Sequence, residues 1–108
     1  MEKKEIDVVE EENKLVVTLS KPYVFEGVTY TEMDLTPLDN IRAADMIKVN
    51  RTLTRSGSTD FLQEMTLEYA CVLAAQVTKM PVEFYEGLPA KDAMKLKSRV
   101  TGFLYGTE

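Results

Sequence analysis

Five aspartates are the first candidates for chemistry in this sequence: Asp34, Asp39, Asp45, Asp60 and Asp92. Two carboxylates can act together as general acid and base, but they need a fixed partner at short range. These five are scattered along the chain. Asp39 and Asp60 stand where helices are predicted to begin, and capping or the helix dipole accounts for them there. We therefore predict no catalytic residue among the carboxylates.

The inventory of other reactive side chains is short. The chain has no histidine and a single cysteine, Cys71. A serine–histidine triad, a cysteine–histidine dyad and a multi-cysteine zinc site are therefore excluded. Cys71 lies among Ala70, Val72 and Leu73, where a thiol behaves as a small apolar side chain with a raised pKa. The five glycines are isolated and form no phosphate-binding loop. We expect no catalytic, cofactor-binding or metal-binding residue, and no enzyme.

Three basic residues form the clearest charged stripe. Lys48, Arg51 and Arg55 follow the i, i+3, i+7 spacing of one helix face, with Arg42 elsewhere on the same predicted helix. Contact with nucleic acid is one interpretation. A solvated face that complements the helix C-terminus is the other, and an acidic protein partner also fits. We favour the solvated face, because the net charge of −5 and a pI of about 4.8 disfavour general nucleic-acid binding.

The acidity is concentrated at the start of the chain. Residues 1–12 hold six of the 18 acids, so the rest of the 108 residues is almost neutral. We predict a flexible acidic leader over residues 1–13 and one domain over residues 14–108, a usual size for a domain. No apolar run reaches the ~20 residues of a membrane span, and the first residues do not resemble a signal peptide. A cytoplasmic location is expected.

A β-hairpin is predicted over residues 14–35. The segment 14–20 alternates apolar and polar side chains, and Glu26-Gly27 supplies a two-residue turn. Pro22 cannot donate to a strand ladder, so the register stays open: a bulge there would shift the pairing by one residue. Three aromatic residues near the turn are expected to pack across the strands without a ligand: Tyr23, Phe25 and Tyr30.

Three helices are predicted after the hairpin, over residues 37–55, 60–79 and 89–105. Thr36, Pro37 and Asp39 favour the start of the first helix. An Asp60–Gln63 capping box favours the start of the second helix, and Pro89 favours the start of the third. The core stripes are Leu38, Met46, Val49 and Leu53, then Phe61, Leu62, Met65 and Tyr69, then Ala93, Leu96, Val100, Phe103 and Leu104. Most of the six methionines fall in these stripes, so core packing is their expected role.

The fold class follows from these elements. Residues 70–75 are apolar on all sides of their helix, so the helices and hairpin, or a second subunit, must cover them. Residues 81–86 fit either a helical turn or a short extended piece. We predict an α+β fold, with an N-terminal hairpin packed against a bundle of three helices, or of four if residues 81–86 are helical.

The order of these landmarks resembles a known family. The segment VTLSKPYVFEGVTYTEMDLTPL combines a Lys-Pro break, a Phe-Glu-Gly turn and a Leu-Thr-Pro helix entry, and LPAKDAMKLKSRVTGFL closes the chain. This layout, over about residues 14–105, resembles the E/41/14-type tail assembly chaperones of long-tailed phages and prophages. The residues that carry the likeness are Lys21, Pro22, Phe25, Glu26, Gly27, Tyr30, Leu35, Leu88, Asp92, Val100, Phe103 and Leu104.

The resemblance implies a non-enzymatic assembly factor. Such a protein binds the tape measure protein while the tail tube polymerises, and leaves before the virion matures. The implied partners are the tape measure protein, the tail tube protein and further copies of the chain, in the host cytoplasm. Members of the family often have a longer, frameshifted form. The resemblance carries no ligand residues, so the partner-binding residues are unknown at this point.

Two other functions remain open from the residues alone. A small nucleic-acid-associated regulator would use the Lys48, Arg51 and Arg55 face. A small enzyme would need the scattered carboxylates to meet in one pocket.

Overall fold

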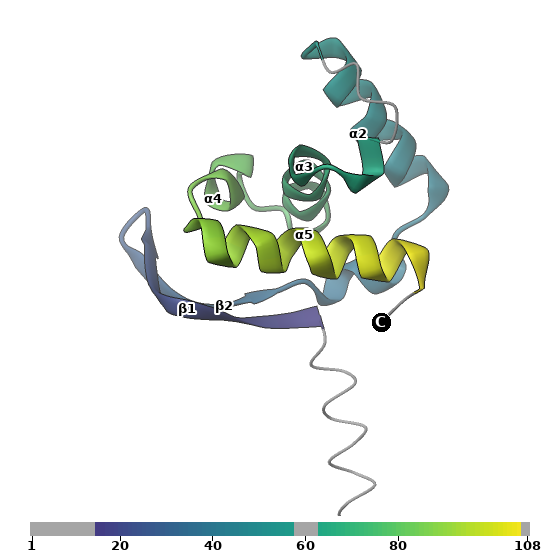
Figure 1. Ribbon diagram of the computed structural model, residues 1–108. Helices are drawn as coiled ribbons and strands as arrows, with labels where there is room; N and C mark the ends of the chain where they lie inside the picture. The colour runs from purple at the N-terminus through teal and green to yellow at the C-terminus, as the bar shows by residue number, and fades with distance from the viewer. Residues whose placement is uncertain (1–14, 58–62, 107–108) are drawn as a thin grey trace, which may run out of the picture.

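A computed structural model describes residues 15–57 and 63–106 of the chain (Figure 1). The predicted leader, residues 1–13, lies outside this part. Within these residues the chain forms two strands, two 3₁₀ helices (η) and four α-helices, an α+β arrangement. They run β1 (Val16–Phe25), β2 (Val28–Asp34), η2 (Thr36–Asn40), α2 (Ala43–Arg55), η3 (Gln63–Met65), α3 (Leu67–Thr78), α4 (Val82–Glu86) and α5 (Ala90–Tyr105).

The two strands form the predicted antiparallel hairpin. Phe25 pairs with Val28, which leaves a two-residue turn at Glu26 and Gly27. Both turn residues have positive φ, 50° and 81°, as the mirror-image turns of tight hairpins require. Glycine adopts this conformation without steric cost, so Gly27 explains why the chain reverses here.

The register is irregular around Pro22, and the irregularity is larger than one residue. Thr18 pairs with Glu32 and Tyr23 with Tyr30, so β1 advances five residues while β2 advances two. Pro22 has no N–H for the ladder, and the Ser20 N–H donates to Asp92 on α5 instead. The extra residues therefore occur where β1 bonds to a helix rather than to its partner strand.

The prediction of a single helix over residues 37–55 is wrong, because the structure has two helices there, η2 and α2. Ile41 and Arg42 are extended, with ψ of 155° and 170°. The Asp45 carboxylate accepts a hydrogen bond from the Arg42 backbone N–H at 2.8 Å, which begins a new helix. Thr36 does not cap this helix with its side chain. Its N–H and its hydroxyl both donate hydrogen bonds to the Asp34 carboxylate.

The second predicted helix begins later than residue 60. Its α-helical part starts at Leu67, where the Thr66 hydroxyl accepts a hydrogen bond from the Tyr69 N–H at 3.0 Å. Met65, predicted to face inward, lies in η3 and is 42% exposed. The expected contributions of Asp60, Phe61 and Leu62 fall outside the described residues. The helix ends as predicted, with Lys79 in the left-handed conformation.

The last part of the chain matches the prediction more closely. Residues 81–86 take the helical alternative as α4, and Gly87 follows it. The helix predicted over residues 89–105 is confirmed as α5, with Ala93, Leu96 and Val100 buried on its inner face. Over residues 15–57 and 63–106 the fold is therefore a hairpin followed by four α-helices.

Helix α3 occupies the centre of the helical layer. Figure 1 shows α5 lying along the hairpin, with α4 and α2 on opposite sides of α3. α3 packs against α5, α4 and α2. Ala70, Leu73 and Ala74 are buried, while Val72 and Ala75 are half-buried. The apolar segment 70–75 is thus largely covered within one chain, so it does not by itself call for a second subunit.

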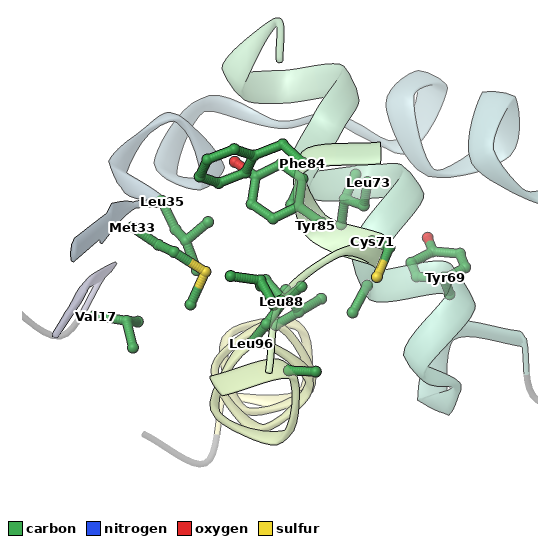
Figure 2. Packing of buried hydrophobic residues seen from close by; sticks show 14 of the residues in the cluster. Val17, Met33, Leu35, Tyr69, Cys71, Leu73, Phe84, Tyr85, Leu88 and Leu96 are labelled. Carbon is green, nitrogen blue, oxygen red and sulfur yellow. The ribbon is translucent and has the colours of Figure 1, made fainter. Parts of the chain in front are cut away.

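One apolar core joins the hairpin to the helices (Figure 2). Figure 2 shows Leu88 and Leu96 between the strand residues Val17 and Met33 and the side chains of α3. The buried residues of this core are Val17, Leu19, Met33, Leu35, Leu38, Val49, Leu53, Tyr69, Ala70, Cys71, Leu73, Ala74, Phe84, Tyr85, Leu88, Ala93, Leu96 and Val100.

Candidate partner-binding surfaces

The candidate aspartates that the structure describes each have a separate local role. Asp34 accepts hydrogen bonds from Thr36, and Asp45 from Arg42. Asp39 lies in the first turn of η2, where it complements the helix dipole. Asp60 lies outside the described residues. Within residues 15–57 and 63–106, no three His, Cys, Asp or Glu side chains are grouped to hold a metal ion.

Asp92 has a role that the sequence pattern did not predict. Its side chain is fully buried on α5 and accepts hydrogen bonds from the Ser20 N–H at 2.8 Å and hydroxyl at 3.0 Å. The Lys95 ammonium lies 3.7 Å from the carboxylate and donates to the Thr18 carbonyl at 2.9 Å. The sequence does contain a signal for the burial of Asp92. It precedes Leu96 and Val100 at four-residue intervals, which places it on the apolar stripe of the helix.

Cys71 is buried on α3, as its apolar neighbours predict. Burial raises the pKa of the thiol to about 11, and the charges of Glu86 and Glu68 add to the shift. A thiol with this pKa is almost entirely protonated at neutral pH and is a poor nucleophile.

The aromatic residues of the hairpin form a cluster with α4. Tyr23 stands opposite Tyr30, so the predicted cross-strand pair is confirmed. The Phe84 ring lies edge-on to Tyr23, Phe25 and Tyr30, with centroids 4.8–5.3 Å away. Tyr23 also donates a hydrogen bond from its hydroxyl to the Phe84 carbonyl at 2.8 Å. These contacts attach the short helix α4 to the hairpin, a role of Phe84 that sequence reasoning did not find.

The predicted basic stripe is present on α2. Lys48, Arg51 and Arg55 are all exposed on one face, and Ile47, with 48% of its surface accessible, borders this stripe beside Arg51. A shallow hollow of about 340 Å³ follows this face, lined by Ile47, Asn50, Arg51, Thr54 and Arg55. Arg42 is exposed at the helix start, separate from the stripe. The α2 basic face, defined as Ile47, Lys48, Arg51 and Arg55, therefore combines positive charge with one exposed apolar side chain.

A groove of about 420 Å³ lies between β2 and α4. Met33, Pro37, Met80 and Phe84 supply apolar surface, and Glu32 and Asp34 supply carboxylates. The remaining residues that line this β2–α4 groove are Tyr30, Thr78 and Tyr85. The Thr78 hydroxyl donates to the Ala74 carbonyl at 2.6 Å, so the Tyr85 hydroxyl, 2.9 Å away, is the donor to Thr78. The groove offers an apolar floor with an acidic rim.

A second groove, of about 270 Å³, lies where α3, α4 and α5 meet. Leu67, Cys71 and Ala93 give it apolar walls, while Glu68 and Glu86 are exposed carboxylates at its edge. Tyr85 lines both grooves, so α4 separates them. We refer to this second site as the α3–α5 groove.

Two methionines depart from the expected core role. Met33 is buried, and Met46 and Met80 are half-buried, but Met65 and Met94 are 42% and 54% exposed. Flexible exposed methionines suit adaptable apolar contacts with a partner. No helix in the described part of the chain combines the length and apolar character needed to cross a membrane.

One of the comparisons with known proteins identifies a family. A family model described as phage tail assembly chaperone proteins, E, or 41 or 14, matches residues 16–105. No curated protein and no solved structure matches the chain. The family match covers the whole described fold from β1 to α5. This chain therefore belongs to the E/41/14 family of phage tail assembly chaperones.

Proposed function

We propose that this protein binds the tape measure protein during assembly of the tail tube and keeps it soluble, without catalysing a reaction. The observation that carries the proposal is the family match over residues 16–105. Two grooves with apolar walls and acidic rims support it, because a chaperone needs reversible contacts with apolar segments of its client. The tail tube protein is a further proposed partner. The protein would act in the host cytoplasm and leave before the virion matures.

The α3–α5 groove is our first choice for the client site. Its volume of about 270 Å³ accommodates one or two apolar side chains of a helix. Glu68 and Glu86 at its edge favour a client helix that carries Lys or Arg beside its apolar residues. Leu67 supplies an apolar contact at the entrance and is 36% exposed.

A charge placed in this groove tests the site. Leu67→Asp would add a carboxylate between Glu68 and the apolar wall, and should sharply reduce the amount of tape measure protein that co-purifies. Val24→Asp is the matched control, because Val24 is an exposed apolar residue at the hairpin tip, away from the groove. Equal co-purification with both variants, at unchanged thermal stability, would move the client site elsewhere.

The second candidate function is nucleic-acid binding by a small regulatory protein. The observation in its favour is the exposed stripe of Lys48, Arg51 and Arg55. Salt-dependent retention on DNA at near-physiological ionic strength, lost in Arg51→Ala, would support it. Passage through the DNA column at low salt would exclude it.

A further inference from the structure

The cations of the α2 basic face have no counter-charge in the described fold. Lys48, Arg51 and Arg55 are exposed, and none of them forms an ion pair with a carboxylate of residues 15–57 and 63–106. Val49 and Leu53 are buried on the opposite side of α2, so this face points away from the core. The face therefore presents concentrated positive charge on a protein whose net charge is −5.

The same face has two further features of an incomplete surface. Ile47 borders the cations with 48% of its surface exposed. In the hollow beside it, the Asn50 Oδ1 atom is buried and has no hydrogen-bond partner among the described residues. Buried acceptors are nearly always bonded, so this atom indicates a donor from elsewhere. An occupant of this face should thus bring apolar side chains, carboxylates and a free N–H group.

The predicted leader, residues 1–13, has this chemistry. It lies outside the described part of the chain, and its first twelve residues hold six acids and two lysines. The segment 6–12, Ile-Asp-Val-Val-Glu-Glu-Glu, combines three branched apolar side chains with four carboxylates and contains no cation. Each of its residues also has a backbone N–H. The hollow of about 340 Å³ accommodates one or two of its apolar side chains.

The leader joins the described fold beside the connection that leads into α2. Leu15, the first described residue, accepts a hydrogen bond through its carbonyl from the Leu35 N–H at 2.6 Å, just before η2. Figure 1 shows the chain running on from η2 to α2. Fourteen extended residues span up to about 45 Å, whereas the extents of the molecule are 50 × 33 × 21 Å. The α2 basic face is therefore within reach of the leader of the same chain.

The two grooves do not fit the segment 6–12. The β2–α4 groove carries Glu32 and Asp34, and the α3–α5 groove carries Glu68 and Glu86. The carboxylates of the leader would be repelled by either acidic rim. Of these three surfaces, the α2 basic face alone offers the opposite charge.

We propose that residues 6–12 dock along the α2 basic face of the same chain. Their apolar side chains cover Ile47 and enter the hollow, and one of their backbone N–H groups donates to the Asn50 Oδ1 atom. Their carboxylates face Lys48, Arg51 and Arg55. The leader thus competes with nucleic acid and other polyanions for this face, in place of the free tail that composition alone favours. The proposal does not depend on the tape measure protein as client.

Amide NMR spectra of the full isotope-labelled chain test the docking. At about 50 mM salt, the amide shifts of residues 6–12 should differ from those of a free peptide of residues 1–14, and about 0.5 M salt should move them to the peptide values. Arg51→Glu should have the same effect at low salt. Lys91→Glu, the same charge reversal at an exposed site on α5, is the matched control and should leave the leader shifts unchanged.

Two results of this experiment would overturn the proposal. One is a set of leader shifts equal to those of the free peptide at low salt. The other is a set of leader shifts that changes on dilution, because a contact within one chain does not depend on concentration.

Binding of heparin, a sulfated polyanion, measures whether the leader covers the face. In Glu10→Gln/Glu11→Gln the leader loses two charges, so the affinity for heparin should rise by roughly fivefold or more, and adding Arg51→Ala should remove the gain. Glu83→Gln/Glu86→Gln makes the same change in net charge at exposed sites on α4, and it should raise the affinity much less. Equal affinities of the two double variants would show an effect of net charge alone and contradict the docking.

Discussion

Asp92 on α5 holds Ser20 on β1 through two hydrogen bonds, one from the Ser20 N–H at 2.8 Å and one from its hydroxyl at 3.0 Å. The two residues are 72 positions apart in the chain. Ser20 lies in the part of β1 that departs from pairing with β2. The buried carboxylate thus replaces the partner that the irregular strand lacks, and it fixes the hairpin to the last helix.

Removal of this carboxylate should destabilise the fold. In Asp92→Ala the Ser20 N–H loses its charged acceptor, and we expect a loss of about 2–4 kcal/mol in the free energy of unfolding. Asp92→Asn keeps one carbonyl oxygen for the N–H and should cost less. Urea unfolding measures both, with Asp39→Ala as an exposed control expected within about 0.5 kcal/mol of the parent. Equal stability of Asp92→Ala and the control would contradict this role.

Gly87 and Tyr23 should be coupled. A Cβ at Gly87 would meet the Tyr23 hydroxyl oxygen at 2.6 Å and the Glu83 carbonyl at 3.2 Å. Gly87→Ala should therefore cost about 1–3 kcal/mol by displacing the hydroxyl from the Phe84 carbonyl. In a Tyr23→Phe background the hydroxyl is absent, so the same change should cost less. Additive costs in the double-mutant cycle would show that the clash is relieved in another way.

Tyr69 should respond to alkaline pH. Its hydroxyl is buried without a hydrogen-bond partner among the described residues, and burial raises its pKa to about 12, helped by Glu64 and Tyr105. The unfolded chain loses this proton near pH 10, so the folded state should lose stability between pH 10 and 12. Tyr69→Phe should match or exceed the parent at pH 7 and fall less steeply above pH 10. Parallel pH profiles would contradict the assignment.

Cys71 should resist thiol reagents in the folded protein. With a pKa of about 11, only about one thiol in a thousand is ionised at pH 8. The side chain is also 5% exposed. A chromogenic disulfide reagent should label it slowly in buffer and at once in urea. Complete labelling of the folded protein within seconds would show that α3 and α4 open readily.

The sequence predicts elements where one local rule dominates. The hairpin follows from strand alternation and the Glu26-Gly27 turn, and α5 follows from Pro89 and its apolar stripe. The break at Ile41 was not predictable from breakers, because neither Gly nor Pro is present there. It depends on the Asp45 side chain, which competes for the Arg42 N–H and starts a second helix.

The surfaces were predictable only in part. The spacing of Lys48, Arg51 and Arg55 is sufficient by itself to place them on one helix face. The two grooves depend on how α4 packs against α3 and the hairpin, and that packing includes contacts of Phe84 with residues about 60 positions away. Such long-range contacts leave no periodic signal in the sequence.

The most direct test of the central claim is the solubility of the tape measure protein of the same phage, expressed with and without this chain. We expect the chain to move the tape measure protein from the pellet to the supernatant, in a complex that survives size-exclusion chromatography at moderate salt. Leu67→Asp should lower that soluble fraction, and Val24→Asp should not. A tape measure protein that is equally insoluble in both expressions, with no complex at low or moderate salt, would contradict the chaperone function proposed for this protein.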